Sequence, residues 1–233
     1  MTGRLIGVGV GPGAPDLVTL RAARLIEAAP VVAYPALAGA ESFARSIVAG
    51  LIRKDAREVA IEIPMTPERA PAQRAYDAGA ARIAEVLSAG GDVVCLCEGD
   101  PLFYGSFMYL FARLNTKFEV EVVPGVTSIA ACAARAGRPL VARNERLTVL
   151  PGPLPEPELR VRIEGAESVA IMKVGRHMTK IRSVIAGLGL LDHAVYVERA
   201  SLPDEVVCPL ADAPESAPYF SMILVTKGAD PWL

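Results

Sequence analysis

The sequence predicts an α/β protein of two compact units built on mainly parallel sheets. The chain has 233 residues, which is long for one domain and natural for two of about 115 residues each. Apolar residues make up 52% of it and charged residues 21%, so the chain can bury enough surface to offset the entropy lost on folding. Short β-rich runs alternate with amphipathic segments, which is the pattern of helices packed over parallel strands.

The first half of the chain alternates strand and helix from its start. Residues 92–97 are nearly all apolar, as expected of a strand that is covered on both faces. Gly90 and Gly91 suit the C-terminal cap of the long helical pattern before them. The predicted strands are residues 4–9, 31–34, 58–63, 92–97 and 118–123. The predicted helices are residues 16–29, 41–52, 67–89 and 105–114.

The pattern resets near residue 115, where a helical segment gives way to a strand. The sequence therefore predicts two domains, residues 1–115 and 116–233. Prolines at alternate positions predict an irregular connection over residues 151–157. The predicted strands of the second half are residues 147–150, 168–174, 194–198, 205–208 and 219–225. Its predicted helices are residues 126–136 and 178–188.

The charge balance argues against two classes of partner. Lys and Arg number 24 and Asp and Glu 26, a net charge of −2, so nothing draws the whole molecule to nucleic acid or to an anionic membrane.

No run of roughly 18 uncharged apolar residues marks a transmembrane helix. The N-terminal residues lack the features of a signal peptide, which makes the cytoplasm the expected compartment.

The cysteines favour the same compartment. They show neither the C-x-x-C spacing of a metal or redox motif nor the density of a disulfide framework, so they are predicted to be reduced, buried thiols. Only two histidines could join them, and no metal site is predicted. The four residues are Cys95, Cys97, Cys132 and Cys208.

A glycine-rich segment, G-V-G-V-G-P-G-A-P-D-L-V-T at residues 7–19, follows the first strand and opens the first helix. Glycines there let a ligand approach main-chain N–H groups. The dinucleotide fingerprint G-x-G-x-x-G is not met, because its last position is Pro12 or Ala14 in the two possible registers. The chain also has no P-loop motif. A tight turn without a ligand is the alternative interpretation.

Two further loops follow predicted strands, where parallel sheets place their ligand sites. In C-L-C-E-G-D-P-L-F-Y-G-S, residues 95–106, Gly99 permits close approach, Asp100 can accept a hydrogen bond and Tyr104 offers an aromatic face. In V-V-P-G-V-T-S, residues 122–128, Thr127 and Ser128 stand at a predicted helix start. An ordinary turn and ordinary helix capping are the alternatives for these two loops.

The three loops together, in this order and at these spacings, resemble those of the tetrapyrrole methyltransferase family. The patterns G-x-G-P-G-x-P-x-L-x-T, G-D-P and P-G-x-[ST]-[SA] all stand intact, and the resemblance covers nearly the whole chain. It implies two α/β domains with a ligand cleft between them, in which the loops hold S-adenosylmethionine. It also implies a homodimer.

The resemblance implies a set of cofactor contacts. Positions in the second half align through the strings I-M-K-V-G and V-E-R-A-S and through the last strand, and would act largely through backbone atoms. The implied cofactor-binding residues are Pro12, Glu98, Gly99, Asp100, Phe103, Tyr104, Thr127, Ser128, Met172, Lys173, Ala200 and Leu224.

The chemistry of the family leads to expectations about catalytic and substrate-binding residues. Methyl transfer is an in-line displacement that depends on proximity and alignment, so no dedicated acid or base is required and no catalytic residue is assigned. A tetrapyrrole bears many carboxylates, which guanidinium groups bind in pairs. The candidates for binding this substrate are Arg143, Arg146, Arg176 and Arg199.

Three longer strings indicate one branch of the family. Residues 98–107, 172–176 and 197–201 resemble the enzymes that methylate early corrin-ring precursors of cobalamin, whereas enzymes acting on uroporphyrinogen III typically read G-G-D-P in place of E-G-D-P. Whether the ring is metal-free or carries cobalt stays open, as does another corrin-ring methyltransferase. A non-catalytic tetrapyrrole-binding protein is the alternative from a different class, and the intact Pro12, Gly99 and Asp100 disfavour it.

Overall fold

The chain divides into two compact units, Met1–Thr127 and Ser128–Leu233. The structure is a computed structural model, and it describes residues 2–64, 66 and 68–228. The sequence predicts the division earlier, at residue 115, and this is corrected by strand β5 (Val120–Val123). That strand pairs with β1 (Leu5–Gly9) in parallel and completes the first sheet, so the chain leaves the first unit only after it.

The first sheet has five strands in the order β3-β2-β4-β1-β5, and every pairing in it is parallel. The carboxyl ends of all five strands therefore lie at one edge, which is where ligand sites are expected. All five residues of β1 and of β4 are buried, as predicted for strands covered on both faces. The remaining strands are β2 (Val31–Leu37), β3 (Arg57–Ile63) and β4 (Val93–Cys97).

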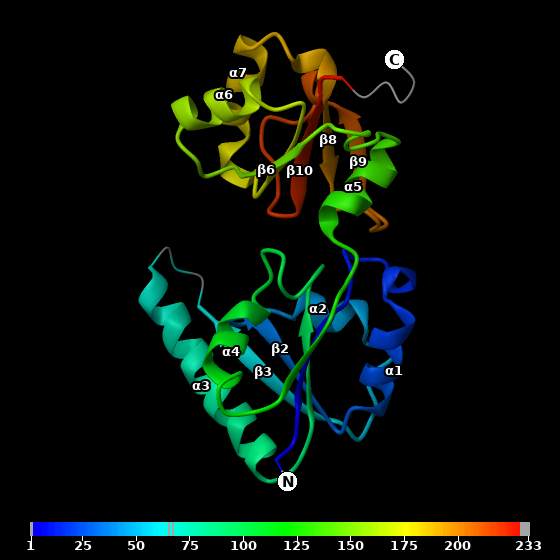
Figure 1. The fold of residues 1–233 in the computed structure, drawn as a ribbon, viewed down its shortest axis with the longest axis vertical. Helices are drawn as coiled ribbons and strands as arrows, with labels where there is room; N and C mark the ends of the chain where they lie inside the picture. Colours follow the sequence, from blue (N-terminus) through cyan, green and yellow to red (C-terminus); the bar gives the residue numbers. More distant parts are fainter. Residues whose placement is uncertain (1, 65, 67, 229–233) are drawn as a thin grey trace. The chain divides into compact units, whose positions relative to one another are not determined.

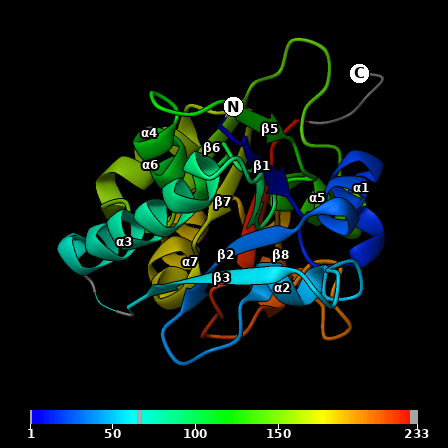
Figure 2. The same cartoon turned by 90° about the horizontal axis from the view of Figure 1, so that it is seen from below.

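Helices cover both faces of the first sheet (Figures 1 and 2). One face packs against α1 and α2 and includes the buried side chains of Val32 and Leu96, and the other packs against α3 and α4 and includes Val59 and Val93. The helices of this unit are η1 (Pro15–Leu17), α1 (Leu20–Ala28), α2 (Phe43–Ile47), α3 (Arg69–Ser88) and α4 (Phe107–Leu114).

The helix predicted over residues 16–29 is two elements in the structure. Pro15 starts a single 3-10 turn, the chain then extends, and Thr19 caps α1 by accepting a hydrogen bond from the Ala22 N–H at 3.2 Å. The helix predicted from residue 41 begins after its cap Ser42 and ends at Ile47. Pro67, the first residue of the third predicted helix, lies outside the described residues.

The second sheet is mixed and has the order β6-β7-β10-β8-β9. Only β6 and β7 pair in parallel; β10 runs antiparallel to β7 and β8, and β9 antiparallel to β8. The predicted parallel pairing holds for the first sheet and is corrected for the second, because the short connection after β8 leaves no room for a helical crossover. The strands are β6 (Leu147–Pro151), β7 (Ser168–Met172), β8 (Ala194–Glu198), β9 (Val206–Pro209) and β10 (Ser221–Thr226).

Helices also cover both faces of the second sheet, with α6 and α7 on one side and α5 on the other (Figure 1). The sequence misses α6, because residues 151–157 are proline-rich. Pro155 stands at the N-cap position of this helix without a side-chain capping bond, and Pro157 lies in the first turn, where a proline has no N–H to leave unsatisfied. The helices are α5 (Ser128–Ala136), α6 (Glu156–Glu164) and α7 (Met178–Gly187), with 3-10 turns η2 (Gly175–His177), η3 (Leu191–His193) and η4 (Leu210–Asp212).

None of the helices within residues 2–64, 66 and 68–228 combines the length and the apolar character needed to cross a membrane.

Candidate functional site

The first two predicted loops are joined at the carboxyl edge of the first sheet. The Val10 N–H donates to the Cys97 carbonyl at 2.9 Å, and Gly11 and Gly99 exchange two main-chain hydrogen bonds of 3.3 and 2.8 Å. Gly11 has a φ of +79°, which favours glycine. The loop after β1 and the loop after β4 therefore form one short antiparallel bridge rather than two independent turns.

Glycine backbones also hold the third loop against the first two. A Cβ on Gly125 would lie 2.1 Å from the Gly99 carbonyl oxygen, and a Cβ on Gly9 would lie 2.6 Å from both Gly125 N and that same oxygen. Main chain thus packs directly on main chain, and no side chain fits. A Cβ on Gly99 would meet only the Val126 carbonyl oxygen, at 3.9 Å, so the open part of this cradle is the space beside the Gly99 Cα.

The Asp100 carboxylate crosslinks the second and third loops. Its Oδ1 accepts from the Leu102 N–H at 2.9 Å, and its Oδ2 accepts from the Gly125 N–H at 3.0 Å. The sequence predicts Asp100 as a cofactor contact; the structure adds a loop-organising role through main-chain N–H groups. A carboxylate has about four acceptor sites, so these two bonds leave capacity for a ligand.

Two aromatic side chains follow Asp100. The rings of Phe103 and Tyr104 meet edge to face, with centroids 5.2 Å apart and planes at 85°. Tyr104 is 43% exposed and has a φ of +56°, a left-handed conformation that is uncommon for a residue with a side chain. The second loop therefore holds an exposed aromatic ring on a strained backbone.

The Glu98 carboxyl is removed from water beside α2. Burial raises its pKa above the ordinary value, and a hydrogen bond from the Ala44 N–H partly offsets this by lowering it. Ala44 lies in the first turn of α2. Glu98 therefore links the second loop to the start of that helix.

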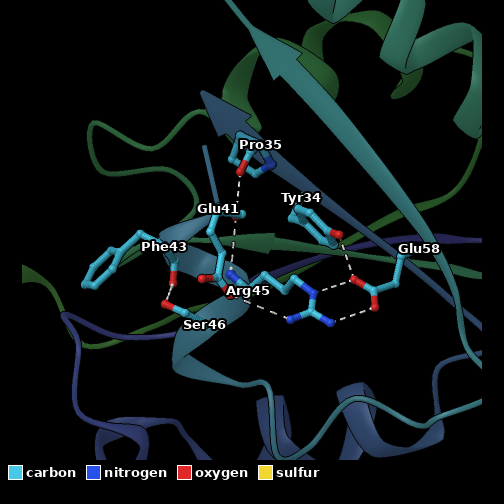
Figure 3. Close-up of polar contacts among 8 residues, drawn as sticks. Tyr34, Pro35, Glu41, Phe43, Arg45, Ser46 and Glu58 are labelled. Carbon is cyan, nitrogen blue, oxygen red and sulfur yellow. Dashed lines mark hydrogen bonds and ion pairs between the residues drawn. The ribbon is translucent and has the colours of Figure 1, made fainter. Parts of the chain in front are cut away.

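A polar network fixes α2 to the sheet (Figure 3). The Arg45 guanidinium donates to both Glu58 oxygens at 2.6 and 2.9 Å, and the Tyr34 hydroxyl donates to Glu58 Oε2 at 2.6 Å. The hydrogen bond from Arg45 holds the pKa of Glu58 below its usual range, while burial and then Glu58 raise the pKa of Tyr34. Ser42 caps the helix and donates to the Pro35 carbonyl at 2.6 Å. Sequence analysis missed this network, which has no local signature.

Pro12, Thr127 and Ser128 complete the predicted contacts from the three loops. All three are partly buried. Thr127 is the last residue of the first unit and Ser128 the first of α5, so the third loop is also the connection between units.

Strands β6, β7 and β8 of the second unit point in one direction, because β7 and β8 both run antiparallel to β10. Their carboxyl ends therefore share one edge. The Gly152 N–H, after β6, donates to the Met172 carbonyl at 2.7 Å, and a Cβ on Gly152 would lie 2.7 Å from the Lys173 carbonyl oxygen. The structure thus brings the predicted Met172 and Lys173 to this edge, beside the exit of β6.

Backbone strain is found at several of the residues predicted from the sequence. Five non-glycine residues in the described part of the chain have a φ between +48° and +69°. Strained residues of this kind concentrate at functional sites. Four of the five are residues selected from the sequence, and the fifth follows the selected Ala200; they are Tyr104, Arg143, Lys173, Arg199 and Ser201.

The structure separates the predicted substrate-binding arginines. Arg176 is exposed in η2 just after β7, and Arg199 follows β8, where it pairs with Asp204 at 2.7 Å. Arg146 instead precedes β6, at the opposite edge, and pairs with Glu167 at 2.7 Å. Arg143 lies in the same segment as Arg146. The four therefore do not form one cluster within the unit.

The charge around η2 is positive. The pKa of His177 is lowered by burial and then by the neighbouring charges of Lys180 and Arg176. Lys180 itself donates to the Gly152 and Leu154 carbonyls, which ties α7 to the loop after β6.

Leu224 is the one predicted contact that lies away from an edge. It sits within β10, is 1% exposed and pairs with both Ala170 and Val195. The start of β10, at Ser221 and Met222, is the part of that strand that reaches the edge shared with Met172 and Glu198. The sequence could not identify this, because strand direction is not a local property.

Within the described ranges, no three His, Cys, Asp or Glu side chains are grouped so that they could hold a metal ion.

Known proteins resemble this chain along its length. The model of the tetrapyrrole (corrin/porphyrin) methylases matches residues 4–214. A precorrin-2 C(20)-methyltransferase of Sinorhizobium sp is 45% identical over 237 residues, which cover 98% of this chain and 97% of that protein. A cobalt-precorrin-2 C(20)-methyltransferase of Salmonella typhimurium is 33% identical over 231 residues, with 97% of this chain and 98% of that protein covered.

A solved structure extends the likeness to the fold. The uroporphyrin-III C-methyl transferase from Thermus thermophilus, complexed with S-adenyl homocysteine, is 27% identical and superposes with a TM-score of 0.69, covering 97% of this chain and 92% of that one. The resemblance predicted from the three loops and the predicted α/β class are both confirmed. The chain therefore belongs to the tetrapyrrole (corrin/porphyrin) methylases, a family of methyltransferases.

Proposed function

We propose that this chain transfers the methyl group of S-adenosylmethionine to carbon 20 of precorrin-2, giving precorrin-3A in cobalamin biosynthesis. The identity of 45% over 98% of the chain to a precorrin-2 C(20)-methyltransferase carries the choice of substrate. The geometry supports the chemistry, because three loops are locked together at the carboxyl edge of a parallel sheet and leave open space beside the Gly99 Cα.

The proposed cofactor contacts fall into two sets. The first unit offers the space beside Gly99 in the second loop and the aromatic ring of Tyr104, whose backbone is strained. The second unit offers main-chain groups at the ends of its strands. Met222, at the start of β10, replaces Leu224 as the proposed contact from this strand, because Leu224 lies inside the sheet. The first set is Pro12, Glu98, Gly99, Asp100, Phe103, Tyr104, Thr127 and Ser128. The second set is Met172, Lys173, Ala200 and Met222.

S-adenosylmethionine supplies an electrophilic methyl group on a positively charged sulfur. The protein's part is to hold that carbon in line with the ring carbon and to exclude water. Main-chain groups fixed by Gly9, Gly125 and Asp100 suit this task, because they need no reorganisation when a ligand arrives. Methylation releases one proton from the ring carbon, and no proton acceptor is assigned.

The ring carboxylates need cationic partners, and the second unit provides them. Lys173 and Arg176 follow β7 and Arg199 follows β8, all at one edge of the sheet. We assign substrate binding to Arg176 and Arg199 and do not assign it to Arg143, which precedes β6 in the same segment as Arg146. Arg146 is left out of the proposal, because it lies at the opposite edge and pairs with Glu167.

A cobalt-bearing ring is the second candidate substrate. The observation in its favour is the relative that acts on cobalt-precorrin-2, at 33% identity. The metal-free ring is preferred because the identity to the corresponding relative is higher, at 45%.

The test begins with calorimetric titration of the purified protein with S-adenosylhomocysteine. One site per chain with micromolar or tighter affinity is expected. Equal amounts of enzyme then receive S-adenosylmethionine with either precorrin-2 or its cobalt form, and mass spectrometry and NMR locate the new methyl group. A higher kcat/KM on precorrin-2, with the methyl at carbon 20, is expected. Faster turnover of the cobalt form, or methylation at another carbon, contradicts the choice of substrate, and no binding contradicts the function.

The setting of the reaction is also part of the proposal. Four free cysteines in the described part of the chain suit a reducing compartment, and we place the protein in the cytoplasm. We further propose a homodimer, since exposed apolar side chains lie before and within α4, at Leu102, Met108 and Tyr109. Cell fractionation and light scattering test these two points, and a monomer at micromolar concentration contradicts the second.

A further inference from the structure

The connection between β8 and β9 is held in a strained conformation. Arg199 has a φ of +49° and Ser201 a φ of +69°, and Ala200 stands between them. Residues with side chains keep such conformations only where their surroundings enforce them. The ladder between β8 and β9 pairs Glu198 with Val206, so it does not reach the residues between. The Arg199 N–H donates to the Phe220 carbonyl at 2.9 Å and the Leu202 N–H to the Arg199 carbonyl at 3.0 Å, so main-chain bonds hold residue 199. The strained Ser201 needs a further restraint.

One carboxylate supplies the restraint. Glu205 is 11% exposed, and its Oε2 accepts from the Ser201 N–H at 2.6 Å. The Arg135 Nε, in the last turn of α5, donates to the same carboxylate at 2.6 and 2.9 Å. Glu205 therefore ties the second strained residue both to its own loop and to a helix that packs on the sheet. Hydrogen bonds to a charged group are the stronger ones.

The loop meets other predicted site residues at the edge of the sheet. Met172 and Val197 both pair with Met222, so the exits of β7 and β8 flank the start of β10. Lys173, just beyond Met172, is strained as well, with a φ of +56°. Ala200 is 8% exposed and has only a methyl side chain, so its main-chain N–H and C=O are the polar groups that it could offer to a ligand.

We propose that Glu205 is a positioning residue for the methyl donor: its carboxylate holds the Ser201 N–H, and with it the backbone beside Ala200, so that Ala200 presents its main chain to S-adenosylmethionine. This inference rests on the proposed function, which makes Ala200 a cofactor contact. Glu205 lies outside every motif that the sequence analysis selected, and its two partners are 4 and 70 residues away in the chain.

The test compares variants at Glu205 by calorimetric titration with S-adenosylhomocysteine. Glu205→Ala is expected to weaken binding tenfold or more, and Glu205→Asp, which keeps the charge on a shorter arm, by at least fivefold. Glu205→Gln is expected to bind within about threefold of the unaltered protein, because its amide oxygen still accepts from the Ser201 N–H. Arg135→Ala is expected to lower the melting temperature and leave affinity within the same threefold.

Kinetics and a rescue separate positioning from general stability. The KM for S-adenosylmethionine is expected to rise in Glu205→Ala while the KM for the ring stays within twofold. Adding Ser201→Gly is expected to recover most of the affinity, since glycine adopts this φ without strain. The matched control is Glu158→Ala, which removes an exposed ion pair with Arg162 on α6 and is expected to change neither constant.

Each outcome decides between the two proposals. Unchanged affinity in both Glu205→Ala and Glu205→Asp overturns the positioning role and leaves the proposed function standing. Failure of the glycine rescue, with both KM values raised together, assigns Glu205 to stability alone. If Glu205→Ala does not fold, Glu205→Asp and the rescue are decisive. No binding by the unaltered protein overturns the proposed function and this inference with it.

Discussion

Replacing Asp100 by alanine removes the carboxylate that joins the second and third loops. Two hydrogen bonds disappear, from the Leu102 N–H at 2.9 Å and from the Gly125 N–H at 3.0 Å. A bond from main chain to a charged group contributes about 1.5–3 kcal/mol. The Leu102 N–H lies in an exposed turn where water replaces the carboxylate, whereas Gly125 N is packed against other main chain. The free energy of unfolding is therefore expected to fall by about 2–3 kcal/mol.

Asparagine at position 100 provides the graded comparison. Its single side-chain oxygen can keep one N–H donor, but its amino group then faces the other, so about half of the loss is expected. Urea unfolding followed by circular dichroism measures both variants, and hydrogen exchange reports the protection of the Gly125 amide. Binding of S-adenosylhomocysteine is expected to weaken in the same order. Weaker binding by Asp100→Ala with unchanged stability and unchanged exchange at Gly125 would refute the crosslinking role and leave a direct contact with the ligand.

Three further predictions concern other parts of the molecule. Gly125→Ala is expected to abolish binding of S-adenosylhomocysteine, because the added Cβ would lie 2.1 Å from a carbonyl oxygen, whereas Gly50→Ala, which meets nothing within 4 Å, is expected to bind normally in the same titration. Glu98→Gln is expected to stabilise the fold at pH 7. Burial raises the pKa of Glu98 in the folded protein, so ionisation of its carboxyl lowers the free energy of unfolding at any pH above the pKa of the unfolded chain, about 4.3. Urea titrations at pH 7 and pH 3.5 should show that gain vanishing at the lower pH, and a gain at both would contradict it. Arg176→Ala is expected to raise the KM for the ring about tenfold and Arg146→Ala to leave it unchanged; equal effects would mean that the sheet edge does not select the substrate contacts.

Much of the fold could be predicted from the sequence because its signals are local. Apolar runs identified the strands, and glycine and proline identified the three loops at their ends. The errors arose where distant pairing decides the outcome. Strand β5 belongs to the first sheet because it pairs with β1, and β10 runs antiparallel to both of its neighbours, β7 and β8, which only the folded pairing shows. The sequence does not predict α6, because its prolines are typical of a loop. The burial of Leu159 and Ile163 against a core, which favours a helix, is known only from the structure.

The candidate site shows the same difference between local signals, which the sequence carries, and distant contacts, which it does not. Motifs found the loops, but Gly125 as a partner of Asp100 and Ser201 as a partner of Glu205 follow only from the folded backbone. The strained conformations of Tyr104 and Lys173 are equally invisible in a sequence, because neither residue type favours them. The direction of the strands, which the sequence does not show, places Arg146 and Arg176 at opposite edges of the second sheet.

The position of β10 has a consequence for how the chain folds during its synthesis. The strand is central in the second sheet, yet it is made after β6, β7, β8 and β9. Residues 1–127 contain every strand of the first sheet and can fold while the rest is still being translated. Until β10 leaves the ribosome, β7 and β8 each keep one edge of main-chain N–H and C=O groups unpaired. A stop codon just before Ser221 would therefore release a first unit with all its strands, attached to two open strand pairs that are prone to aggregate.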